Sequence, residues 1–134
     1  MLLAHDTLIA VADGEKLNLY RNSGNEAEPR RVAIDSTEPS GENYSGGSRH
    51  HSSSGNPDAS QVEEDSFAAA TAAMLNTMAL GNKFDALVVI AAPRTLGELR
   101  KHWHKALEAK LVVEMPKDLT GHSVADIEAA LAKA

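Results

Sequence analysis

The sequence contains no cysteine, and none of its apolar runs approaches the roughly 20 residues that span a bilayer. Without cysteine no disulfide can form, which is compatible with a reducing compartment. The apolar start, MLLAHDTLIAVADG, has no basic leader, and Asp6 interrupts it, so it lacks the pattern of a signal peptide. We therefore expect a soluble, cytoplasmic protein that neither spans a membrane nor depends on disulfides.

The chain has a formal net charge of -6, which disfavours nonspecific binding of nucleic acid over its whole surface. This charge still permits a local basic site. A chain of 134 residues is expected to fold as one domain, 1–134, burying about two-thirds of the surface that the unfolded chain exposes.

The first part of the chain has the pattern of three antiparallel strands. Residues 7–12 are apolar apart from the first, and Asp13 and Gly14 then supply the turn of a hairpin. Residues 16–21 alternate between apolar and polar side chains, and residues 31–35 alternate again after a polar turn. We predict strands over these three ranges.

Three capping boxes mark the starts of three helices, because in each a serine or threonine precedes an acid by three residues. The pairs are Ser60 with Glu63, Thr95 with Glu98, and Ser123 with Asp126. We predict helices over 60–81, 95–107 and 123–132. On the second of these, a stripe at helical spacing should pack on the sheet. Its members are Leu96, Leu99, Trp103 and Leu107.

Two further apolar runs, 85–91 and 110–115, predict strands that alternate with these helices. The run 85–91 is typical of a strand buried on both faces. The predicted fold is α/β with the ribonuclease H-like order βββαβαβα. Right-handed crossovers then give a five-stranded mixed sheet in the order 3-2-1-4-5. Asp13 and Arg94 follow strands that point the same way, so both should emerge at the edge where open α/β sheets bind ligands.

A serine- and glycine-rich stretch at about 36–60 has no apolar pattern, and its length far exceeds the usual loop of about 4 to 6 residues. Its centre holds our other candidate binding residues, Tyr44, Gly46, Gly47, Ser48, Arg49, His50 and His51. The two glycines permit close approach of the backbone to RNA, and the basic residues give the stretch positive character. A flexible polar loop and a binding tip both fit this composition.

Four segments together resemble one family: VADGEKLNLYRN, FAAATAAML, FDALVVIAAPRTLGELRKHW and EMPKDLTGHSVADIEAAL. The family is the bacterial host-attachment proteins, which are related to the middle domain of archaeal and eukaryotic class-1 peptide release factors and to Pelota-like proteins. The most specific segments are 92–100 and 117–120. The resemblance covers nearly the whole chain and implies a release-factor middle-domain fold.

In those release factors, a glycine-glycine-glutamine motif before the long helix enters the peptidyl transferase centre and helps to position water. The corresponding residues here are Gly46, Gly47 and Ser48, so the glutamine is missing. The resemblance therefore implies a ribosome or a structured RNA as partner, bound by 44–51 together with Asp13 and Arg94, and no catalysis is carried over. We expect no cofactor and no metal.

Four other points of interpretation remain open. A ribonuclease H-like nuclease needs several carboxylates around two metal ions, but the centres of the strands at 7–12 and 85–91 carry none. The pairs His50 with His51 and His102 with His104 lack the spacing of a helical zinc site. The basic run from Arg94 to Lys105 fits either a solvated face or an RNA contact. An adhesion-related interaction protein is suggested only by the name of the resembled family.

Overall fold

The computed structural model describes residues 6–23, 34–37 and 57–133. Its elements are β1 (Leu8–Ala12), β2 (Leu17–Asn22), β3 (Ile34–Thr37), α1 (Pro57–Leu80), β4 (Leu87–Ala91), α2 (Pro93–Arg100), α3 (Lys105–Glu108), β5 (Leu111–Pro116) and α4 (Val124–Lys133). The fold is α/β, as the sequence indicates. Of the predicted strand at 31–35, residues 31–33 lie outside the described part.

The strands form one mixed sheet in the order β3-β2-β1-β4-β5. β1 pairs antiparallel with β2 and parallel with β4, which confirms the predicted neighbours of the first strand. β4 pairs parallel with β5. β1 and β4 are buried along their whole length, because they lie at the centre of the sheet and have apolar side chains on both faces.

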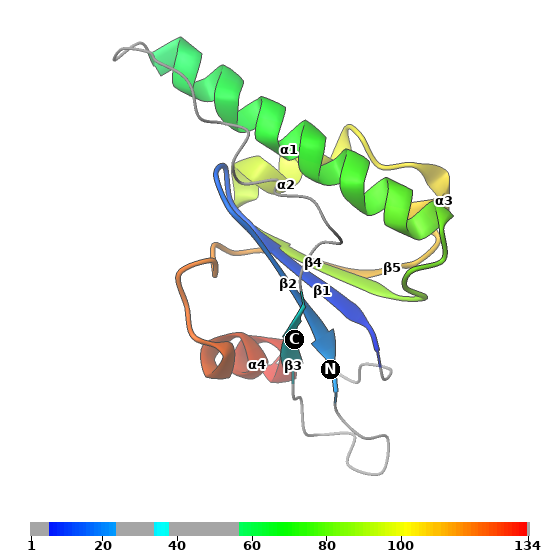
Figure 1. Cartoon of the computed structure of the whole chain (residues 1–134). Helices are drawn as coiled ribbons and strands as arrows, with labels where there is room; N and C mark the ends of the chain where they lie inside the picture. Colours follow the sequence, from blue (N-terminus) through cyan, green and yellow to red (C-terminus); the bar gives the residue numbers. More distant parts are fainter. Residues whose placement is uncertain (1–5, 24–33, 38–56, 134) are drawn as a thin grey trace.

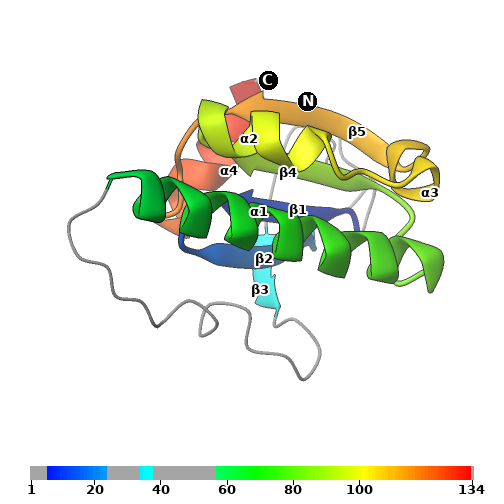
Figure 2. The same cartoon turned by 90° about the horizontal axis from the view of Figure 1, so that it is seen from above.

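Helices cover both faces of this sheet. α1, α2 and α3 lie on one face and α4 lies on the other (Figures 1 and 2). On the first face, Leu75 and Leu99 pack with Leu8 and Val89 in the larger apolar cluster. On the second face, Ile127 and Leu131 of α4 belong to a smaller cluster. In the described part of the chain, no helix is long and apolar enough to cross a membrane.

The predicted single helix over 95–107 is wrong, because the chain forms two short helices there, α2 and α3. Asn76 of α1 accounts for the break. Its side-chain amide donates to the His102 carbonyl at 2.8 Å and accepts from the His104 backbone N–H at 2.9 Å. His104 then caps α3, since its Nδ1 accepts from the Ala106 N–H at 3.0 Å. The turn between the helices is therefore satisfied without helical hydrogen bonds.

Two of the three predicted capping boxes are also wrong. α1 begins at Pro57 and α2 at Pro93, so Ser60 and Thr95 lie inside their helices. Proline is favoured at the first helical position, where its missing N–H costs nothing and its φ angle already suits a helix. The third box is confirmed in part: the Ser123 hydroxyl accepts from the Asp126 N–H at 3.1 Å, and α4 begins at Val124.

The pairing of β4 with β5 contains one irregularity. Leu87 pairs with Leu111 and Val88 with Val113, so Val112 has no partner on β4. Val112 is 51% exposed. An extra residue of this kind is a β-bulge, which bends and twists the strand that carries it.

Candidate functional site

The carboxyl ends of β1, β4 and β5 meet at one edge of the sheet. Ala12 pairs with Ala91, and Ala91 pairs with Pro116, so the three strands end side by side. We call residues 13–16, 92–95 and 117–120, which follow these ends, the carboxyl edge. Asp13 and Arg94 both belong to it, and they follow neighbouring parallel strands. The structure therefore places these two candidate residues at the same edge.

Asp13 organises the turn between β1 and β2. Its Oδ1 accepts from the N–H groups of Glu15 and Lys16, both at 2.7 Å, and the Asp13 N–H donates to the Lys16 carbonyl at 3.0 Å. Oδ2 lies 2.8 Å from the Thr120 hydroxyl. Asp13 thus connects the hairpin to the loop after β5.

Thr120 lies between two carboxylates. Its Oγ1 is 2.8 Å from Asp13 Oδ2 and 2.9 Å from Asp118 Oδ1. A hydroxyl has a single hydrogen, so it donates to one ionised carboxylate at a time. The Thr120 backbone carbonyl also accepts from the Asn18 side-chain amide at 3.4 Å. These contacts hold the segment 117–120, which the sequence marked as specific, against the β1–β2 turn.

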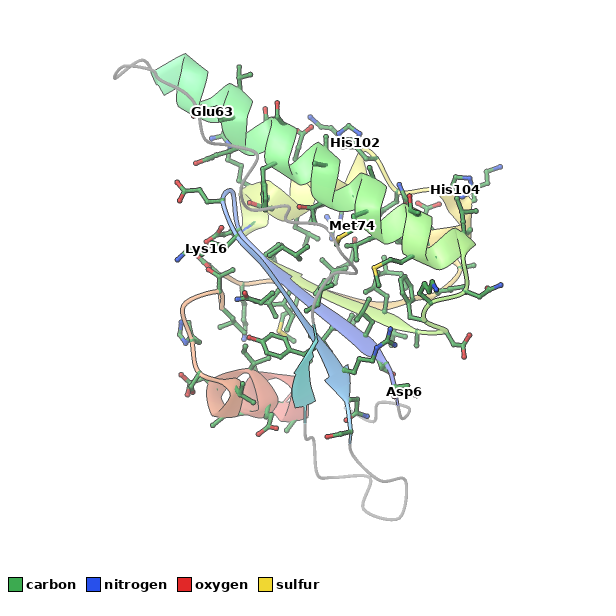
Figure 3. All side chains as sticks on the ribbon, in the orientation of Figure 1. Asp6, Lys16, Glu63, Met74, His102 and His104 are labelled. Carbon is green, nitrogen blue, oxygen red and sulfur yellow. The ribbon has the colours of Figure 1, made fainter. Side chains whose placement is uncertain are left out.

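The first half of α1 also reaches this edge. A Cβ atom added to Gly14 would stand 2.8 Å from Glu64 Cγ, so any larger residue would displace that side chain. Figure 3 shows Lys16 on the β1–β2 turn and Glu63 on the part of α1 nearest to it. Gly14 is therefore a point of close approach between the hairpin and the helix.

Arg94 is exposed in the first turn of α2. The residue before that helix, Ala92, has extended backbone angles, φ -52 and ψ 146, and provides no side-chain cap. The first turn contains no acidic residue. An uncapped helix start carries free N–H groups and the positive end of the helix dipole, which favour anions.

The remaining candidate binding residues lie outside the described residues. They are Tyr44, Gly46, Gly47, Ser48, Arg49, His50 and His51. Their predicted role as a binding tip stays a prediction.

The basic run after Arg94 is largely paired with acids. Glu98 binds Lys101 at 3.1 Å and His102 at 3.2 Å. Hydrogen bonds from Lys101 and then His102 lower the pKa of the Glu98 carboxyl, although burial opposes this shift. The i,i+3 and i,i+4 spacing could have predicted these pairs. Such pairing favours the interpretation of this surface as a solvated helix face.

Glu114 is a residue that the sequence did not single out. Its carboxylate accepts from Arg100 Nε at 3.0 Å and from the Trp103 indole N–H at 3.1 Å. Trp103 is half-buried and packs against the larger apolar cluster, as predicted for a member of the apolar stripe. No local pattern signals the contact, because Glu114 comes from β5.

Among residues 6–23, 34–37 and 57–133, no group of three or more histidine and acidic side chains is arranged to hold a metal ion. His102 and His104, both labelled in Figure 3, bind Glu98 and the Ala106 N–H respectively. A two-metal nuclease centre would therefore need ligands from other parts of the chain.

Comparison with known proteins identifies a family that the chain resembles over most of its length. Residues 6–131 match the model of a family described as bacterial archaeo-eukaryotic release factor family 12. The matched range includes every strand and helix described above apart from the end of α4. No curated protein matches the chain.

Proposed function

The chain belongs to the bacterial archaeo-eukaryotic release factor family 12, and we propose that it is a cytoplasmic domain that binds the ribosome or a structured RNA. The family match over residues 6–131 is the observation that carries this proposal. The sheet order β3-β2-β1-β4-β5 supports a ribonuclease H-like fold of the release-factor middle-domain type.

The proposed contact combines the segment 44–51 with the carboxyl edge. In the chain, 44–51 stands between β3 and the long helix α1, which is the position of the glycine-glycine-glutamine loop in the release factors that the sequence resembles. Arg49 supplies a charge that is never lost near neutral pH. Gly46 and Gly47 permit close approach to a phosphate backbone. Ser48 replaces the glutamine, and we propose binding without peptide release.

Electrostatics should govern this binding. The net charge of -6 opposes a broad contact with RNA, so affinity has to come from a few well-placed cations and should fall as salt rises. Arg94 at the carboxyl edge and Arg49 in the segment 44–51 are the cations that we assign to the contact.

Co-sedimentation of the full chain with ribosomes at low and high salt tests the proposal. We expect association that weakens with salt, and Arg49→Ala should weaken it further, lowering the salt slope of log K by about 1. Lys133→Ala is the matched control, because it removes one charge at the exposed end of α4. No ribosome association, or equal losses in both variants, would overturn the proposal.

A peptidyl-tRNA hydrolysis assay tests the absence of catalysis. We expect no release of peptide above the background without protein. Release that depends on Ser48 would contradict the noncatalytic part of the proposal, and it would show that this residue can stand where the release factors have glutamine.

A further inference from the structure

The side chain of His104 caps the start of α3. Its ring nitrogen Nδ1 accepts a hydrogen bond from the Ala106 backbone N–H at 3.0 Å. A backbone N–H is always the donor, so Nδ1 has to offer a lone pair and carries no hydrogen. A neutral imidazole has a single N–H, which in this ring is therefore on Nε2. The cap thus requires His104 to be neutral and to adopt one of its two tautomers.

Protonation of His104 is incompatible with this cap. A protonated imidazole carries hydrogen on both nitrogens, so Nδ1 would face the Ala106 N–H as a second donor. The positive charge would also stand at the start of a helix, where the dipole disfavours cations. Histidine side chains exchange this proton between about pH 5 and 8, and His104 is exposed to solvent. The cap is therefore present while the ring is neutral and is lost as falling pH protonates it.

The other histidine of the same turn responds in the opposite direction. His102 Nε2 lies 3.2 Å from Glu98 Oε2, and the two residues have the i,i+4 spacing of helix neighbours. A ring with hydrogen on Nε2 donates to this carboxylate whether it is neutral or protonated, and protonation adds opposite charge to the pair. Acid therefore weakens the start of α3 while it strengthens the attachment of the turn to α2.

The surroundings of His104 hold the turn but not the protonated ring. Asn76 of α1 bonds to the His102 carbonyl and to the His104 backbone N–H, and neither of these groups titrates. α1 packs against α3 and has no charged residue over 72–80. Glu108 stands four residues along the chain from His104 and offers a protonated ring a carboxylate in place of the N–H. The other charged or titratable residues near His104 in the chain are Glu98, Lys101, His102, Lys105 and Lys110.

We propose that the turn between α2 and α3 is a pH-sensitive joint, in which protonation of His104 releases the start of α3 while the turn stays attached to α1 and α2. α3 lies beside the last turns of α1 (Figures 1 and 2). It carries Leu107, which has no exposed surface and belongs to the larger apolar cluster. Acid therefore loosens one end of the helical layer on this face and leaves the sheet folded. This regulation does not depend on the proposed function.

NMR of the full chain between about pH 5 and 8 tests this joint with two measurements. Long-range proton–nitrogen spectra show which ring nitrogen of His104 carries hydrogen, and at the upper end of the range we expect Nε2 alone. Hydrogen exchange of the Ala106 amide, corrected for the intrinsic rate at each pH, reports the cap itself. Its protection should fall about fivefold on acidification, which is the size expected for the loss of one helix cap.

Two substitutions separate titration of the ring from loss of the cap. His104→Asn keeps a capping side chain that does not titrate, so the protection of the Ala106 amide should no longer depend on pH. His104→Ala should give low protection at every pH. His122→Asn is the matched control, because it removes another exposed histidine, beside Asp126 of α4, and should keep the wild-type response. Hydrogen on Nδ1 of His104 at high pH, constant protection in the wild type, or the wild-type pH dependence in His104→Asn would overturn the joint.

Discussion

Leu99 shows how much one apolar side chain of α2 contributes. It has no exposed surface and lies in the apolar cluster between α1 and the sheet. Leu99→Ala should lower the free energy of unfolding by about 2 to 5 kcal/mol, because it leaves a cavity in a packed core. Chemical denaturation measures this loss. Leu80→Ala is the matched control: Leu80 is 58% exposed and its loss should cost about 0.5 kcal/mol or less. Equal costs would mean that α2 does not cover the core.

Glu98 should titrate below the ordinary range of a glutamate. The hydrogen bonds from Lys101 and His102 favour its ionised form and lower its pKa in the folded protein. Because the folded pKa lies below the unfolded one, this carboxylate stabilises the fold above its unfolded pKa. The contribution disappears as pH falls through the folded pKa. Carboxyl NMR titration measures the shift, and Lys101→Ala should move the pKa of Glu98 back up. A pKa at or above the ordinary value would contradict the pairing.

At the scale of elements, Asn76 decides where one helix ends and the next begins. It donates to the His102 carbonyl and accepts from the His104 N–H, so it satisfies the turn between α2 and α3. Asn76→Ala removes both bonds and should cost about 1 to 3 kcal/mol in chemical denaturation. Asn76→Asp keeps the acceptor for the His104 N–H but sets a carboxylate oxygen against the His102 carbonyl oxygen, so it should not restore the wild-type stability. If the alanine variant were as stable as the wild type, another cause of the break would be needed.

The elements that the sequence predicted well are those with strong local patterns. The apolar runs around β1 and β4 specified both strands and their parallel pairing, and Ser123 marked the start of α4. The break after α2 was missed because Asn76, which causes it, is distant in sequence while the leucine spacing continues through the turn. The helix starts predicted at Ser60 and Thr95 were too late in the chain. Prolines are favoured at the first helical position, and α1 begins at Pro57 and α2 at Pro93.

The candidate site was predictable only where the order and direction of the strands determine it. Strand direction alone placed Asp13 and Arg94 at one edge. The hydrogen bond from the Thr120 hydroxyl to Asp13 joins residues far apart in the chain. The uncapped N–H groups of α2 can be recognised only once it is known that the helix begins at Pro93. No local pattern of residues contains either feature.

At the scale of the whole molecule, the paired strands β1 and β4 should be the last part to open. They lie at the centre of the sheet, are fully buried, and have helices over both faces (Figure 1). Native-state hydrogen exchange should therefore be slowest at Leu8–Ala12 and Leu87–Ala91, and much faster in the short helix α3. Mass spectrometry of the exchanged chain measures this order. Slower exchange in α3 than in β4 would show that opening does not begin at the periphery.

The bulge at Val112 has a consequence for solubility. β5 is an outer strand rich in valine, and straight outer strands of this kind recruit further copies of a protein into aggregates. The extra residue at Val112 twists the strand, and Pro116 at its end has no N–H to offer. A second copy therefore meets a bent and interrupted row of backbone groups. We therefore expect the irregularity that exposes this apolar side chain to disfavour filament growth from this side of the sheet.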